Sequence, residues 1–223
     1  MQHMLAFLLL LASIQLLAWL LPAWPNPKGI PGYLPIHTLM ETVSIVISMM
    51  VFSVGWNTHN RNLSGNIVLL AGVFFSVALL DFLHTVSYGG MPDFISHNDT
   101  QKHLYFWLFA RMFAALALLG VALRPWQPQT SSTRRYWIFG ALIGATALIY
   151  WAVMYHQNWF PDTFIPGQGL TSFKKNIEYL IIIIHLVTAL MFLMRMREKQ
   201  SFNVVWLSNR AQYFPPISVQ YFP

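Results

Sequence analysis

The sequence alternates between long apolar segments and short segments that hold most of its charged residues. A membrane-spanning helix needs about 20 consecutive, mostly apolar residues. Six segments approach that length, and they are roughly Met4–Leu21, Ile36–Trp56, Gly65–His84, Leu104–Leu123, Tyr136–Tyr155 and Ile177–Met194. The pattern therefore predicts an all-α fold, an integral membrane helical bundle of six transmembrane helices.

The composition agrees with this prediction and excludes several classes of function. Of the 223 residues, 56% are hydrophobic and only 9% are charged, whereas soluble domains carry about 25% charged residues. The chain has no cysteine, which excludes disulfides and thiolate sites. It also lacks a nucleophile–base pair, a phosphate-binding loop and a signature zinc motif, so we expect no enzymatic activity.

The two ends of the chain need separate interpretation. Met4–Leu21 resembles a signal peptide in length, but no Lys or Arg precedes it and no clean small-residue cleavage site follows it, so we predict an uncleaved first span. At the other end, the closely spaced prolines of Ala211–Pro223 oppose a helix. We therefore divide the chain into a transmembrane domain, 1–200, and an aberrant or disordered tail, 201–223, with no further domain after it. A PPII-like extension is the alternative for the tail.

The basic residues predict the orientation, because cytoplasmic loops of membrane proteins are enriched in Lys and Arg. With a cytoplasmic N-terminus, seven basic residues fall in inside segments and four in outside loops. The inside residues are Arg61, Arg124, Arg134, Arg135, Arg195, Arg197 and Lys199, and the outside residues are Lys28, Lys102, Lys174 and Lys175. The net charge of +6 is thus a topology signal, and we expect no nucleic-acid partner.

Titratable and polar side chains occur in the outer halves of four predicted helices. No Lys, Arg, Asp or Glu falls in the inner half of any span. Because such groups turn inward in lipid and pair, we predict one outward-facing ligand pocket. Its candidate residues are His37, Glu41, Asp81, His84, Tyr88, Arg111, Glu178 and His185.

A purely structural network is the alternative to a ligand pocket. Arg111 can pair with Asp81 or Glu178, and a single histidine at a helix mouth, such as His103, is more often structural than functional. For the whole set this alternative weakens, because several buried charges stabilise a bundle less than apolar packing does. We therefore favour a ligand site.

The chemistry of the pocket leaves several ligands open. His37, Glu41, His84 and His185 are candidate ligands for a divalent metal, since imidazole and carboxylate suit several such ions. A histidine pair from two helices can also hold a haem. Arg111 favours an anionic ligand or compensates the carboxylates, and histidines can sense protons.

Four segments of the chain resemble a known family. They are His37-Thr38-Leu39-Met40-Glu41-Thr42, Phe52-Ser53-Val54-Gly55-Trp56, Asp81-Phe82-Leu83-His84-Thr85 through Gly90-Met91-Pro92, and Phe106-Trp107-Leu108-Phe109-Ala110-Arg111. The combination is similar to the bacterial membrane-associated sensor domains of the third MASE class.

The resemblance implies an input module in the bacterial inner membrane. Such a module is normally fused to a cytoplasmic output, a diguanylate cyclase (GGDEF) or phosphodiesterase domain or a histidine kinase, often with a PAS domain between. We expect a homodimer that relays its signal through the sixth helix. The family leads us to expect a further apolar span where 202–223 stands. The alternatives are a transporter or ion-translocating protein, and a plain membrane anchor.

Overall fold

The computed structural model describes residues 32–58, 65–125 and 132–213, with side chains up to Arg195, and separate positions between residues 6 and 20. Contacts divide the chain into two compact units, 1–39 and 40–223.

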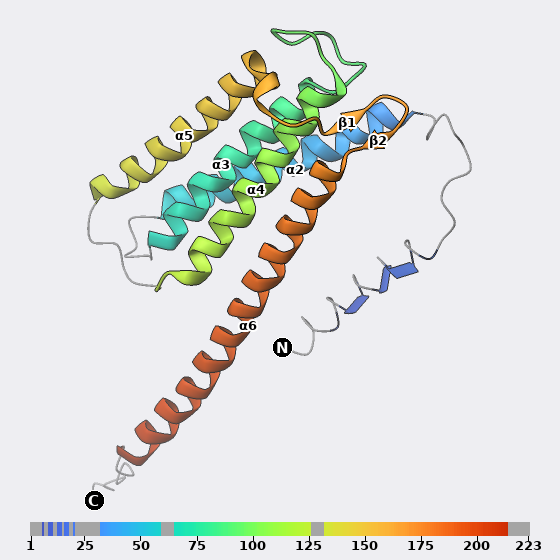
Figure 1. Cartoon of the computed structure of the whole chain (residues 1–223). Coiled ribbons are helices and arrows are strands. Elements are labelled where there is room, and N and C mark those ends of the chain that lie inside the picture. Colours follow the sequence, from blue (N-terminus) through green and yellow to red (C-terminus); the bar gives the residue numbers. More distant parts are fainter. Residues whose placement is uncertain are drawn as a thin grey trace, which may run out of the picture. The chain divides into compact units, whose positions relative to one another are not determined.

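Five long helices make up nearly all of the described chain (Figure 1). They are α2 (Tyr33–Asn57), α3 (Gly65–Val86), α4 (Thr100–Leu123), α5 (Ser132–Tyr155) and α6 (Ser172–Tyr213). Each is long and apolar enough to cross a membrane, which confirms the second to sixth predicted spans. The predicted first span, Met4–Leu21, lies largely outside the described residues, so a sixth helix is not confirmed.

Helix α3 is the most buried helix of the bundle, because α4 and α5 both pack against it. One buried cluster joins α3, α4 and α5, and it consists of Leu80, Tyr105, Phe106, Ala110, Val153 and Met154. A second cluster joins α4 to α6 through Leu108, Ala115 and Ile181. Helix α4 is thus the element through which α3 and α6 are connected.

Helix α2 packs on α3 at a small-residue contact flanked by aromatic rings. A Cβ atom at Gly55 would lie 2.9 Å from the Cβ of Ala71, so the two helices meet almost backbone to backbone. Next to this contact the Phe52 ring packs on Phe75 at 4.7 Å and on Phe139 at 5.7 Å between centroids. Small residues permit such close approach between membrane helices.

One end of the bundle, here called the loop end, carries the segments 87–99 and 156–171. The first segment closes around Lys102, whose side chain is fully buried. Its Nζ donates to the carbonyls of Phe94 at 2.7 Å and Ser96 at 2.9 Å, and to Oδ1 of Asn98 at 3.0 Å. Lys102 therefore stabilises the conformation of the loop segment 87–99.

The second loop segment is fastened to α4 by Gln101. Its Oε1 accepts hydrogen bonds from the main-chain N–H groups of Thr163 and Phe164, at 2.8 and 3.2 Å. Beyond it, β1 (Phe164–Ile165) and β2 (Gly169–Leu170) form a two-residue antiparallel hairpin, preceded by the 3-10 turn η2 (Gln157–Trp159). Both loop segments are thereby tied to the first turn of α4.

Helix α6 continues well past the bundle (Figure 1). Near the end opposite the loops, Arg195 Nη1 donates to the carbonyl of Arg124, directly after α4, at 2.8 Å. We expected a tail from residue 201, yet the helix is unbroken through Tyr213. Residues 214–223 lie outside the described residues, and the domain boundary at residue 200 stays a prediction.

Candidate functional site

A buried ion pair between α3 and α4 lies at the centre of the candidate site. Asp81 is fully buried, and its Oδ1 accepts a hydrogen bond from Arg111 Nη2 at 2.9 Å. The Arg111 side chain keeps 30% of its surface exposed. Opposite charges at such a depth need a partner to offset their desolvation, and Asp81 is one of the two partners predicted for Arg111.

His84 lies one turn further along α3 and is buried as well. Its Nδ1 is 2.7 Å from the main-chain carbonyl of His103. Because a carbonyl only accepts, Nδ1 carries the proton and donates it, so in the neutral ring Nε2 carries the lone pair. This is the arrangement found in metal-binding histidines, whose second nitrogen is oriented by a backbone carbonyl.

Glu41 brings a carboxylate from α2 to the same place. One of its oxygens lies within 4.8 Å of a His84 ring nitrogen, and its charge repels that of Asp81. Among the described residues, Glu41 Oε2 and Asp81 Oδ2 are buried without a hydrogen-bond partner. Buried carboxylate oxygens in that state usually have a proton, water or ion beside them.

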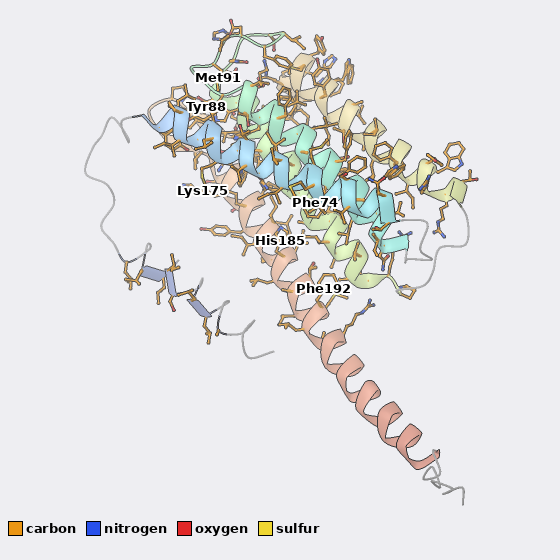
Figure 2. All side chains as sticks on the ribbon, turned by 180° about the vertical axis from the view of Figure 1, so that it is seen from behind. Phe74, Tyr88, Met91, Lys175, His185 and Phe192 are labelled. Carbon is orange, nitrogen blue, oxygen red and sulfur yellow. The ribbon has the colours of Figure 1, made fainter. Side chains whose placement is uncertain are left out.

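Arg111 also lines a groove of about 480 Å³ that lies between α4 and α6. Arg111 and Trp107 line it from α4, and Glu178 and His185 line it from α6. Figure 2 shows Lys175 closer to the loop end than His185 on the same helix. Arg111 therefore belongs both to the buried ion pair and to the groove wall.

The structure thus arranges the predicted site residues in two connected groups. Glu41, Asp81 and His84 lie together, and Glu178 and His185 lie in the groove. Tyr88 contacts this region through His103, with their ring centroids 4.7 Å apart, and lies at the loop end (Figure 2).

The proposed metal ligands divide differently. His37 belongs to the first unit, where its ring stacks on Tyr33 at 5.4 Å. Of the four proposed metal ligands, Glu41 and His84 are the two that lie together within the second unit. The full metal set therefore stays a prediction.

Sequence reasoning left two contributing residues out of the pocket. His103 supplies the carbonyl that orients His84, a role that no side-chain pattern reveals. Trp107 lies beside two cations, with Lys174 Nζ 5.1 Å and Arg111 Cζ 5.9 Å from its ring centroid. Trp107 lies one helical turn before Arg111, and this spacing could have indicated that Trp107 belongs to the site.

Comparison with known proteins identifies the domain. The family model of the MASE3 membrane-associated sensor domain matches residues 29–214. No curated protein and no solved structure gives a significant match. The matched region contains all five described spanning helices and both groups of site residues. The chain therefore belongs to the MASE3 family of membrane-associated sensor domains.

Proposed function

We propose that this sensor domain detects a small ligand, a metal ion or a redox cofactor in its polar pocket and passes the signal to a cytoplasmic output domain. The output would be a GGDEF, PAS or histidine kinase domain, and the module would act as a homodimer in a bacterial inner membrane. The observation that carries the proposal is the buried Asp81–Arg111 pair, whose arginine also lines the groove against α6.

The polar atoms around this pair support ligand binding over a purely structural role. Asp81 Oδ2 and Glu41 Oε2 are buried, and no described residue hydrogen bonds to them. An ion pair that served packing alone would be expected to satisfy both of its carboxylate oxygens, because unsatisfied buried acceptors are destabilising. A bound cation or ligand donor would meet this need.

For a metal ion, Glu41 and His84 are the best-supported ligands. Their ligand atoms lie within 4.8 Å, and the carbonyl of His103 orients His84 so that Nε2 can bind a metal. His37, one helical turn before Glu41 in the sequence, and His185 are further candidates. A haem would use a histidine pair instead. Metal content and an absorption spectrum of the purified protein distinguish these versions.

The route of the signal would run through α4 and α6. Arg111 contacts the pocket midway along α4, and Arg195 donates to the carbonyl of Arg124 directly after the end of α4. A change in the pocket would alter the position of α6 against α4, a small helix shift of the kind used in many switches. The pocket would face outward, with the N-terminus in the cytoplasm.

The proposal is tested in a fusion of this domain to a cyclase output with a measurable product. We expect His84→Ala and Arg111→Gln to abolish regulation of the output, while His97→Ala, at an exposed loop histidine, leaves it intact. If His84→Ala and Arg111→Gln both regulate normally in a stably folded protein, the domain is a plain anchor. Tags after Lys199 and within 157–175 should report opposite sides of the membrane.

A further inference from the structure

We propose that the groove between α4 and α6 binds a lipid-soluble quinone, whose carbonyl oxygens accept hydrogen bonds from Arg111 and His185. This inference rests on the proposed sensor function and names the class of its ligand. It uses the groove wall of the site and not the buried Glu41–His84 group.

The position of the groove selects for a ligand that arrives through lipid. Its wall runs along α6 from Lys175 to His185, a distance of about 15 Å by helical rise. Trp107, Tyr179, Ile181 and Ile182 supply its apolar surface. A volume of about 480 Å³ falls within the range of small-molecule pockets, about 300–1,000 Å³. An aromatic head group with part of an apolar chain suits both the size and the walls.

Two polar side chains that face the groove, Arg111 and His185, can donate hydrogen bonds to a ligand, while the carboxylate of Glu178 is paired with Lys174. Arg111 has five N–H donors, and the one bond it makes among the described residues is that to Asp81. His185 makes no hydrogen bond with any described residue, and its ring lines the same groove. Two donor side chains on opposite helices fit a ligand that carries acceptor oxygens on a rigid ring.

The charges argue for a neutral ligand over an anionic one. Arg111 is already paired with Asp81 at 2.9 Å, and Glu178 with Lys174 at 2.6 Å. Lys175, the other cationic residue that lines the groove, is exposed and lies near the loop end (Figure 2). The inner part of the groove is therefore balanced in charge, so a fatty-acid or phosphate head would bury an uncompensated negative charge there, at considerable cost. Quinone carbonyls accept hydrogen bonds without that cost.

Binding at this place would act on the signalling helix directly. Arg111 lies on α4, which packs on both α3 and α6, and a ring between Arg111 and His185 would link α4 to α6. Asp81 would then share Arg111 with the ligand. The oxidised quinone, with two carbonyl acceptors, matches these donors, whereas the quinol exposes hydroxyl groups in their place.

The test uses the whole chain in phosphatidylcholine nanodiscs that contain no quinone. Decylubiquinone is titrated in, and its bound fraction and the midpoint of thermal unfolding are recorded. Decylbenzene, with the same chain but no carbonyl, and palmitate, with an anionic head, are the comparison probes. We expect saturable binding and a raised midpoint with decylubiquinone alone. We also expect His185→Leu, which removes a donor, and Arg111→Lys, which replaces the planar guanidinium fork by a single ammonium group, each to weaken that binding about tenfold.

Matched variants separate loss of binding from loss of fold. Ile182→Trp fills the groove without removing a donor and should also abolish binding, whereas Arg134→Lys and His97→Leu change exposed residues and should not. Equal binding of decylbenzene, preferential binding of palmitate, or unchanged binding in His185→Leu and Ile182→Trp would overturn the inference. If quinone fails to bind while His84→Ala still abolishes regulation in a stably folded fusion, the inference falls and the sensor proposal stands.

Discussion

Gly55 of α2 faces Ala71 of α3 so closely that a Cβ atom at position 55 would lie 2.9 Å from the Ala71 Cβ. Neither group can move out of the way, since one would be attached to the backbone of each helix. The glycine of the Phe52–Trp56 segment therefore has a packing role that fixes how α2 meets α3.

The first prediction concerns this contact. Gly55→Leu should lower the free energy of unfolding by about 1–3 kcal/mol or more, because overpacking forces the helices apart. SDS titration in mixed micelles measures the change. Gly144→Leu is the control, since position 144 on α5 has open space around it, and an equal loss in both variants would argue against the close contact.

The second prediction concerns the buried ion pair. Arg111→Gln leaves the fully buried Asp81 without its partner and should destabilise the protein by about 3–5 kcal/mol. Adding Asp81→Asn to the same protein should recover most of that loss, because no unpaired charge then remains. A double-mutant cycle on unfolding free energies tests this, and additive losses would contradict the pairing.

A third prediction concerns Lys102, which is buried within the loop segment 87–99. Lys102→Met removes the donor that serves the carbonyls of Phe94 and Ser96 and the side chain of Asn98. We expect hydrogen exchange across 87–99 to accelerate by an amount equivalent to about 1–3 kcal/mol. Lys175→Met, at an exposed lysine, should leave the exchange of this segment unchanged.

The fourth prediction is a pH dependence in the same segment. Hydrogen bonds from the main-chain N–H of Asn98 and from His97 hold the pKa of Asp93 below its ordinary value. A carboxyl whose folded pKa is lowered contributes stability above its unfolded pKa, and the contribution is lost as the pH falls through the folded pKa. The protection of the Asn98 amide, measured against its intrinsic exchange rate at each pH, should therefore fall in acid. In Asp93→Asn this acid dependence should be absent, and its persistence would point to another group.

The sequence predicted four of the five described helices to within four residues at each end, because their apolar runs are long. Helix α6 runs from Ser172 to Tyr213, well beyond the predicted Ile177–Met194, because its last turns are polar. The boundaries at the loop end were less accurate, since α4 begins at Thr100 rather than Leu104. Asp99 caps that helix by accepting from the N–H of Lys102 at 2.6 Å. The first turn of α4 is polar, so the apolar run alone did not indicate where the helix starts. The capping aspartate could have indicated it.

The candidate site was predictable in its depth but not in its pairing. The placement of titratable residues in the outer halves of the spans follows from the cost of burying charge in lipid. Whether Arg111 pairs with Asp81 or with Glu178 depends on the rotation and packing of three helices. The orientation of His84 by a backbone carbonyl depends on the same packing. Gln101 and Thr163, 62 positions apart, illustrate the same limit in the loops.

The continuity of α6 has a consequence for any domain attached to it. A helix of 42 residues is about 63 Å long and turns about 100° per residue, so whatever follows it inherits a fixed angular phase. One residue inserted after Arg195 would turn the attached domain by about 100° while moving it only about 1.5 Å. Seven inserted residues would lengthen the helix by about 10 Å and nearly restore the phase. Comparing the two insertions would therefore separate torsional coupling from axial coupling.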